Sequence, residues 1–321
     1  MIVPILLLIF GLVILIFGGE IFIRGSASLA RKLNVSPIVI GLTVVAFGTS
    51  VAELVVNILA AFKGSSDLAV GNILGSNIAN VLLILGVAAI IRNLKIKKGT
   101  AWKELPLCIL SVIILFILGN DVLFNGGATI NILTSGDGLI LLGFFLIFLY
   151  YTYGLTKVEG EKEDIKVYSW FYSILFILVG LAGIMGGAKL MVDNGIKIAE
   201  IFGLSQLFIG VTVVAIGTSL PELVTSIIAA YHGHDDLVIG NIVGSNIFNV
   251  LWILGLTPII SPIRMNTQAN VDILIAILSV LLLFVFMFIG HKHQRYQLRR
   301  WQGVVFLLFY SAYIFYVFYR G

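Results

Sequence analysis

The sequence predicts an all-α integral membrane protein with ten transmembrane helices, arranged as two inverted five-helix repeats. The 321-residue chain is 60% hydrophobic and only 11% charged, with a mean hydropathy of +1.10. A soluble domain of this size needs far more charge to cover its surface. Several apolar runs reach about 20 residues, the length of a membrane-spanning helix. Two long motifs also recur at a constant offset of 169 residues.

Apolar runs set the order of the predicted spans. The first run has no basic leader and no A-x-A cleavage site, so we interpret it as a span and not as a removable signal peptide. The second run begins with Ser36 and Pro37, a pair typical of a helix start. The ten predicted spans are residues 1–23, 37–62, 67–92, 102–120, 136–154, 169–190, 206–230, 236–260, 268–290 and 301–319.

The distribution of basic residues predicts the orientation. With the N-terminus outside, fifteen Lys and Arg fall on the inner side and five on the outer side. This bias predicts a multi-pass protein of the cell membrane with its N-terminus outside. The net charge of +4 lies at the ends of apolar runs and not in one patch, so we expect no nucleic-acid partner. The basic run 291–300 is expected to anchor the last two spans in the lipid bilayer at anionic headgroups.

The recurring motifs indicate an internal duplication. Residues 38–55 return at 207–224 with twelve of eighteen positions identical, and residues 67–86 return at 236–255 with fifteen of twenty identical. The equal offset is the signature of a repeat. Each half holds five spans, an odd number, so the second copy must enter the membrane from the opposite side, as in many secondary transporters. The predicted units are a first repeat (1–156), a short cytoplasmic linker (157–168) and a second repeat (169–321).

Two polar segments outside the motifs are interpreted as solvated. The linker is acidic, but its spacing does not match an EF-hand, which disfavours a calcium-sensing loop. His232 and His234 lie in a short loop beside Asp235 and Asp236. A solvated turn is favoured there over a metal or proton-sensing site.

Each copy of the first motif places one carboxylate, Glu53 or Glu222, in a segment that is otherwise apolar or small. A carboxylate at membrane depth costs roughly 2.5–3.5 kcal/mol and by default marks an ion or proton path. No Lys or Arg lies at comparable depth to neutralise either one. The matched positions predict one shared site near the middle of the membrane, where the repeats meet.

The polar side chains around these glutamates are all oxygen-ligand types, which suit hard cations such as Ca²⁺, Na⁺ and Mg²⁺ better than zinc or copper. A helix break at Gly-Thr-Ser would add backbone carbonyls near Ala46 and Gly48. Packing between helices explains the Ser-Asn pairs at 76–77 and 245–246 equally well, and the glycines of both motifs allow close helix approach. Asn72 and Asn241 could equally hold a helix break. The side chains concerned are Thr49, Ser50, Ser76, Asn77, Asn80, Thr218, Ser219, Ser245, Asn246 and Asn249.

Charge counting favours an exchanger. Two carboxylates in one dry site repel each other unless a cation is present. One divalent ion neutralises both, and so do two or more monovalent ions or protons. Because an empty site is penalised, reorientation should favour the loaded protein.

The motif pairs G-T-S-V-A-E with G-N-I-L-G-S-N-I-A-N, and G-T-S-L-P-E with G-N-I-V-G-S-N-I-F-N, resemble the two alpha-repeats of the cation/calcium exchanger superfamily. The pattern is most similar to its prokaryotic sodium/calcium exchanger branch. This resemblance implies a calcium site made by Glu53, Glu222, Thr49 and Thr218. It implies sodium sites made by Ala46, Ser50, Ser76, Asn80, Ala215, Ser219, Ser245 and Asn249.

Two departures from the family pattern lead to expectations of their own. Asn249 stands where members of this branch often carry Asp, which leaves coupling to Na⁺ or to H⁺ open. Val51-Ala52-Glu53 replaces the usual L-P-E, so Glu53 is expected on a straighter helix than Glu222. The proton/calcium branch typically has an acid in a G-N-x-x-E context, where this chain has G-S-N.

The sequence thus predicts an antiporter that exchanges Ca²⁺ for Na⁺ by alternating access, with a Ca²⁺/H⁺ antiporter as the alternative. The resemblance implies that spans 1 and 6 are the moving pair. We expect a monomer without a cofactor. A cation channel is the alternative of a different class, disfavoured because no charged ring marks a vestibule. An enzyme is disfavoured because no His, G-x-S-x-G or partner nucleophile accompanies the carboxylates.

Overall fold

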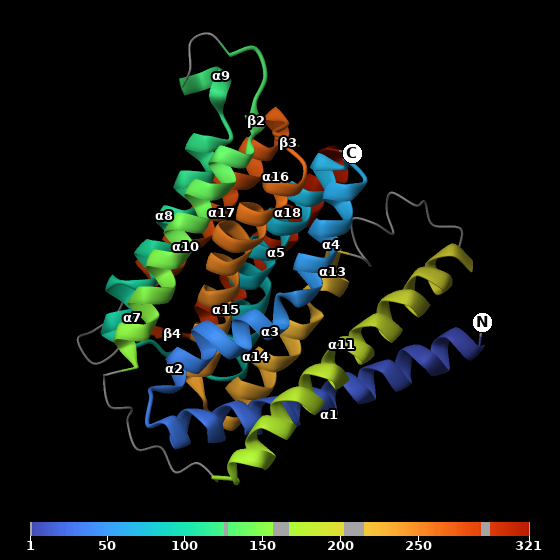
Figure 1. The fold of residues 1–321 in the computed structure, drawn as a ribbon. Helices are drawn as coiled ribbons and strands as arrows, with labels where there is room; N and C mark the ends of the chain where they lie inside the picture. Colours follow the sequence, from blue (N-terminus) through green and yellow to red (C-terminus); the bar gives the residue numbers. More distant parts are fainter. Residues whose placement is uncertain (1, 125–127, 157–166, 202–214, 290–295, 321) are drawn as a thin grey trace.

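The computed structural model describes residues 2–124, 128–156, 167–201, 215–289 and 296–320 (Figure 1). Within these ranges eight helices are long and apolar enough to cross a membrane, and two further helices form a ninth span bent by 45°. The predicted all-α membrane fold is therefore confirmed at this level. The first part of the predicted span 206–230 lies outside the described residues.

The first half follows the predicted runs closely. α10 starts with a capping box, in which the Asp137 backbone N–H donates to Thr134 Oγ1 and the Thr134 backbone N–H donates to Asp137 Oδ2. The elements, with η for a π-helix, are α1 (Ile2–Leu33), α2 (Pro37–Ile40), η1 (Gly41–Val45), α3 (Ala46–Thr49), α4 (Val51–Phe62), α5 (Ser66–Ala79), η2 (Asn80–Ile84), α6 (Leu85–Ile91), β1 (Leu94–Lys95), α7 (Lys98–Trp102), α8 (Glu104–Leu118), α9 (Asp121–Phe124), β2 (Ile132–Leu133) and α10 (Ser135–Leu155).

The second half places elements of the same kind in the same order around its motifs. In both halves the helix of the second motif changes from α to π within one residue of an asparagine, at Asn80 in η2 and at Asn249 in η4. The described elements are α11 (Trp170–Ile201), α13 (Ala215–Thr218), α14 (Leu220–His232), α15 (Asp235–Ile247), η4 (Phe248–Ile253), α16 (Leu254–Ile260), β3 (Ile263–Arg264), α17 (Thr267–Phe286), β4 (Gln297–Leu298) and α18 (Arg300–Arg320).

α1 and α11 lie side by side and cross the rest of the bundle obliquely (Figure 1). Each has 32 residues and outlasts its predicted span, 1–23 or 169–190. α1 continues past its first charges because Glu20 and Arg24 form an i, i+4 ion pair of 2.7 Å. Basic residues in its last turn also suit the helix dipole. Hydropathy finds only the apolar part of such a helix.

Glycines line the contact between α1 and α11. Along α1 they repeat every seven residues, and each lies against the α11 backbone. A Cβ added to Gly18 would lie 2.7 Å from the Ile184 nitrogen, and one added to Gly187 would lie 2.6 Å from the Leu15 nitrogen. Small residues allow such backbone contact between membrane helices. We call this contact the glycine seam; it consists of Gly11, Gly18 and Gly25 facing α11 and of Gly180, Gly183 and Gly187 facing α1.

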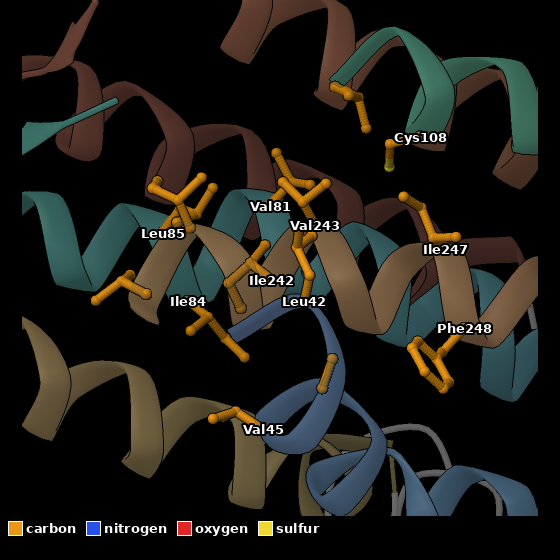
Figure 2. Packing of buried hydrophobic residues seen from close by; sticks show 14 of the residues in the cluster. Leu42, Val45, Val81, Ile84, Leu85, Cys108, Ile242, Val243, Ile247 and Phe248 are labelled. Atoms are coloured by element: carbon orange, nitrogen blue, oxygen red, sulfur yellow. The ribbon is translucent and has the colours of Figure 1, made fainter. Parts of the chain in front are cut away.

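α15 forms the centre of the bundle, and every one of its residues is buried. It packs backbone to backbone on η1, because a Cβ added to Gly240 would lie 2.9 Å from the Gly41 Cα. A Cβ added to Gly244 would likewise lie 2.9 Å from the Leu42 Cα. The close approach expected at the motif glycines is confirmed for Gly41, Gly240 and Gly244, but it is wrong for Gly71 and Gly75, where an added Cβ would meet no atom within 4 Å among the described residues. Figure 2 shows Leu42 and Ile242 in the apolar cluster at this contact.

Two short antiparallel strand pairs connect the halves. β1 pairs with β4 in the register Leu94↔Leu298, and β2 pairs with β3 in the register Leu133↔Ile263. Each pair joins two loops that the predicted ten-span topology would place on the same side of the membrane. The sequence analysis did not anticipate these strands, since two residues carry no periodicity.

Candidate cation site

Each half has a short break in the helix of its first motif. Ser50 separates α3 from α4 with φ −77° and ψ 6°, and Ser219 separates α13 from α14 with φ −90° and ψ 4°. The break considered at Gly-Thr-Ser is thus present in both halves, although the Ala46 carbonyl still accepts a backbone hydrogen bond. The break places the Glu53 helix at 45° to the segment before it.

The span that carries Glu53 is not straight, whereas the comparison with the Glu222 span stays a prediction because residues 202–214 lie outside the described residues. The Glu53 span bends without any proline, because the turn arises at Ser50 and a π-helix already loosens the segment before it. Pro221 stands at the second position of α14, where an absent N–H leaves no helical hydrogen bond unmade. The first half shows that such a break forms without proline, and Pro221 is compatible with the break in the second half.

Both carboxylates are fully buried in one polar centre. Ser76 Oγ donates to Glu53 Oε1 at 3.1 Å, and Ser50 Oγ, from the other half, donates to Glu222 Oε1 at 3.3 Å. Ser219 Oγ donates to Ser76 Oγ at 3.3 Å, which joins the two sides. The structure therefore brings the two motif carboxylates into one buried, hydrogen-bonded centre, and ion binding at this centre stays a prediction.

An asparagine cluster lies next to the carboxylates. Asn77 Nδ2 donates to the Asn246 carbonyl at 3.2 Å, and Asn246 Nδ2 donates to the Asn77 carbonyl at 3.3 Å. Asn80 Nδ2 donates to Asn246 Oδ1 at 2.9 Å, and Asn249 Nδ2 donates to Asn77 Oδ1 at 3.0 Å. These reciprocal bonds cross between the halves and fix which way each amide points.

Four buried oxygens in this centre have no hydrogen-bond partner among the described residues. They are Oε2 of Glu53 and of Glu222, and Oδ1 of Asn80 and of Asn249. An unpaired buried acceptor costs about 1–3 kcal/mol, and more if it is charged. A cation satisfies several acceptors at once, whereas a donor side chain satisfies one. No group of three or more His, Cys, Asp or Glu that could hold a metal occurs in the described ranges, so amides and hydroxyls must complete any ligand set.

Asn241 joins the helix break of the first half to the glutamate helix of the second. Thr49 Oγ1 donates to Asn241 Oδ1 at 3.1 Å. Asn241 Nδ2 donates to Thr225 Oγ1 at 3.1 Å and to Ser226 Oγ at 3.0 Å, one turn beyond Glu222. One amide thus holds a predicted calcium ligand in place relative to the opposite carboxylate.

Asn72 makes the corresponding connection in the other direction. Thr218 Oγ1 donates to Asn72 Oδ1 at 3.4 Å, and Asn72 Nδ2 donates to Asn57 Oδ1 at 3.1 Å. The sequence analysis did not single out Asn57, Thr225 or Ser226. A signal was present, because these polar residues lie three or four positions after each glutamate, on its helix face.

The remaining predicted ligands lie at the same centre or at its edge. Ala46 and Ser245 are fully buried, and Ser245 Oγ lies 3.5 Å from Thr49 Oγ1. The Ala46 carbonyl accepts the Ser50 N–H at 3.0 Å. Thr218 is partly buried. Ala215 begins α13, but its side chain lies outside what the structure describes.

The other polar candidates lie apart from this centre. His232 Nε2 is 2.8 Å from Glu20 Oε2, so it joins the end of α14 to α1 and is not a solvated loop residue. The acidic part of the linker, residues 157–166, lies outside the described residues.

Comparison with known proteins gives consistent matches over nearly the whole chain. A family model described as sodium/calcium exchanger protein matches residues 3–154 and 172–319. The chain is 32% identical to the sodium/calcium exchanger MaX1 of Methanosarcina acetivorans, with 98% of each chain covered. It is 25% identical to the Ca²⁺/H⁺ antiporter ChaA of Bacillus subtilis, with 81% of this chain and 79% of that protein covered.

A solved structure gives a match of similar extent. It is the sodium-calcium exchanger NCX_Mj soaked with 2.5 mM Na⁺ and 0.1 mM Ca²⁺. The TM-score is 0.82 at 33% sequence identity, with 98% of each chain covered. The fold described above is therefore that of a known membrane exchanger.

Proposed function

The chain belongs to the sodium/calcium exchanger protein family, and we propose that it exchanges Ca²⁺ for Na⁺ across the cell membrane by alternating access. The observation that carries this proposal is the set of four unpaired buried oxygens on Glu53, Glu222, Asn80 and Asn249. Such oxygens are the ligands of hard cations. Transport of this kind needs neither a catalytic residue nor a cofactor, and the proposal includes none.

The proposal assigns Ca²⁺ to Glu53, Glu222, Thr49 and Thr218. Two observations support this assignment: both carboxylates converge on one buried centre, and asparagines hold both threonines from the opposite half. The Na⁺ sites are assigned to the surrounding hydroxyls, amides and backbone carbonyls of Ala46, Ser50, Ser76, Asn80, Ala215, Ser219, Ser245 and Asn249.

Charge balance accounts for exchange at such a centre. One Ca²⁺ neutralises the two carboxylates, and so do two or more Na⁺. An empty centre leaves two like charges facing each other in a medium of low dielectric constant, which is costly. Conversion between outward-open and inward-open states is therefore favoured only with ions bound, so that one ion species leaves as the other enters.

The same proposal includes ten transmembrane helices in two inverted five-helix repeats, 1–156 and 169–321, joined by a cytoplasmic linker at 157–168, with the N-terminus outside. The matched breaks at Ser50 and Ser219 support the repeat. The strand pairs support the topology, since each joins loops that must share a side. One chain supplies both carboxylates, which is consistent with a functional monomer.

The moving pair is proposed to be α1 with α11, the helices of predicted spans 1 and 6. The glycine seam supports this, because its direct backbone contact joins the two helices to each other. They cross the bundle obliquely (Figure 1) and pack on the helices that carry the site, since a Cβ added to Gly19 of α1 would lie 2.7 Å from Ile228 Cδ1 of α14. Sliding of this pair would open the centre to one side and then to the other.

Flux measurements test the counter-ion. Proteoliposomes loaded with Na⁺ are expected to accumulate radioactive Ca²⁺ when external Na⁺ is removed, and to saturate with rising Ca²⁺. Uptake that ignores the Na⁺ gradient and follows a pH gradient would replace this proposal with Ca²⁺/H⁺ exchange. Unsaturable flux without any counter-ion would replace it with a channel.

Proton coupling is the second candidate, favoured by one specific observation. Asn249 adds no third carboxylate to the site. The negative charge that bound cations must neutralise is therefore smaller by one than with Asp at this position. The similarity to a Ca²⁺/H⁺ antiporter also favours proton coupling. Against it stand the six hydroxyl side chains around the carboxylates, which bind Na⁺ well and add no proton site.

Replacing Asn241 with Ala is expected to weaken apparent Ca²⁺ affinity about tenfold. The change removes the hydrogen bonds that Asn241 makes with Thr49, Thr225 and Ser226, at a cost of about 1–3 kcal/mol. Thr49 is then no longer held in position for Ca²⁺ binding. Calcium dependence of exchange in proteoliposomes measures the affinity.

The matched control for Asn241→Ala is Asn270→Ala. Asn270 pairs with Asn120 through two amide hydrogen bonds of 2.7 and 2.9 Å, so the same kind of bond is lost outside the site. A purely structural role for Asn241 predicts that both variants lose stability and neither loses Ca²⁺ affinity.

A further inference from the structure

A cavity of about 560 Å³ opens where three helices end, apart from the cation site. The last residues of α6, the last residues of α14 and the first residue of α18 surround it. Its lining residues are Ile91, Arg92, Asn93, Ala230, Tyr231 and Arg300.

Aromatic residues place this cavity at the headgroup level of the membrane. Tyr231 is 78% exposed in its wall, and Trp301, next to Arg300, is 46% exposed. Trp and Tyr concentrate where hydrocarbon meets headgroups, because their rings are apolar and their N–H and O–H groups are polar. The cavity therefore opens neither to bulk water alone nor to acyl chains alone.

Two guanidinium groups are held at this cavity by the surrounding backbone. Arg300 Nη2 donates to the Ile91 carbonyl at 3.2 Å, and its backbone N–H donates to Asn93 Oδ1 at 3.2 Å. Arg92 lies against Gly233, which has φ +84°, and a Cβ there would come within 2.5 Å of Arg92 Nη1. Glycine thus makes room for the guanidinium. Both groups are positioned before any ligand binds.

Positive charge around this cavity exceeds the negative charge of the neighbouring carboxylates. Arg92 also lines an adjoining cavity of about 360 Å³ with Lys95, Lys97, Asp235 and Asp236. Asp235 pairs with Arg92 Nε at 3.3 Å, and Asp236 pairs with Lys97 at 2.8 Å. The two cavities together present four cationic side chains against two carboxylates. An anion is the ligand this balance favours.

We propose that the cavity binds the phosphodiester of one anionic phospholipid, with Arg92 and Arg300 on the phosphate. Planar guanidinium groups match phosphate oxygens in pairs. Ile91 and Ala230 give the cavity an apolar wall, so an acyl chain has a surface to pack against. Soluble phosphate shares the charge but gains nothing from that wall.

A bound lipid at this place would connect helices that carry the cation site. α14 carries Glu222 and ends at the cavity, while α6 continues the helix that begins with α5 and bears Ser76 and Asn80. A phosphate held between α6, α14 and α18 would fix these ends relative to one another. The binding itself does not depend on which ion the protein exchanges.

Native mass spectrometry of the full-length, delipidated protein in detergent tests this proposal. The probes are phosphatidylglycerol, phosphatidylcholine and inorganic phosphate. Phosphatidylglycerol is expected to bind in preference to phosphatidylcholine, and Arg300→Gln is expected to weaken it about fivefold, the equivalent of ~1 kcal/mol for each basic residue at an anionic surface. The affinity of Arg300→Lys for phosphatidylglycerol should lie between those of the unmodified protein and Arg300→Gln, because lysine keeps the charge but lacks the paired N–H donors of the guanidinium.

The matched control is Arg299→Gln, which removes the same charge one residue away from the cavity lining. Equal loss of phosphatidylglycerol in both variants would overturn the proposal in favour of a diffuse basic surface. Stabilisation by inorganic phosphate that depends on Arg300, without a preference for phosphatidylglycerol, would overturn the lipid as the ligand. Thermal unfolding in phosphatidylcholine verifies that each variant is folded. All of these readouts stand whether or not Ca²⁺ is exchanged for Na⁺.

Discussion

Glu53→Gln is expected to abolish Ca²⁺ uptake into Na⁺-loaded proteoliposomes. Glutamine keeps the size of the side chain and can still accept the hydrogen bond that Ser76 donates. It removes one of the two charges that neutralise a divalent ion, and an uncompensated charge at a buried site is strongly unfavourable. The same loss is expected for Glu222→Gln, since the two carboxylates act as one unit.

Glu104→Gln is the matched control for this loss of transport. Glu104 is almost as buried as Glu53, at 2% exposed, but it lies at the start of α8 and accepts its hydrogen bond from Tyr151 on α10. This variant is expected to retain uptake. Transport that survives Glu53→Gln would show that this carboxylate is not needed for exchange. Equal loss in Glu104→Gln would show that removing any buried acid stops transport, whatever its place in the fold.

Gly187→Val is expected to cause a large loss of folded protein while it leaves the ion ligands untouched. A Cβ at this position would lie 2.6 Å from the Leu15 nitrogen and 2.7 Å from the Gly11 carbonyl oxygen. Backbone atoms cannot rotate away, so α1 and α11 must separate, and overpacking of this kind costs about 1–3 kcal/mol or more. Thermal unfolding and the yield of monodisperse protein measure the effect.

The neighbouring glycine provides the control. A Cβ added to Gly186 meets no atom within 4 Å among the described residues, and Gly186 is exposed on the outer face of α11. Gly186→Val therefore adds the same bulk to the same helix without touching α1. Equal melting temperatures for the two variants would contradict the glycine seam as a close backbone contact.

Much of this fold could be predicted because the signals are local or repeated. Apolar runs located the spans, and the offset of 169 residues paired Glu53 with Glu222 before any coordinates were known. The break at Gly-Thr-Ser was predictable because Gly, Thr and Ser at membrane depth make poor continuous helix. That the break forms with or without a neighbouring proline could not be predicted. The φ and ψ values of Ser50 and Ser219 are nearly equal, although only Ser219 is followed closely by a proline.

The rest depends on contacts between distant segments. Asn241 binds Thr49 across 192 positions, and Asn80 binds Asn246 across 166, distances at which a single sequence carries no signal. The π-helices likewise depend on tertiary packing, because their residues are ordinary apolar ones. The excess length of α1 was missed since Glu20 and Arg24 look like an exit from the membrane until they are seen to pair.

The short strand pairs have a consequence for how the two halves are kept together. In each pair one strand comes from the first half and the other from the second: β1 pairs with β4, and β2 pairs with β3. Backbone hydrogen bonds therefore join the two halves at both ends of the bundle. The halves are therefore aligned by non-covalent strand pairs at opposite ends of the bundle. Two polypeptides that each carried one half would have the same strand pairs to align them.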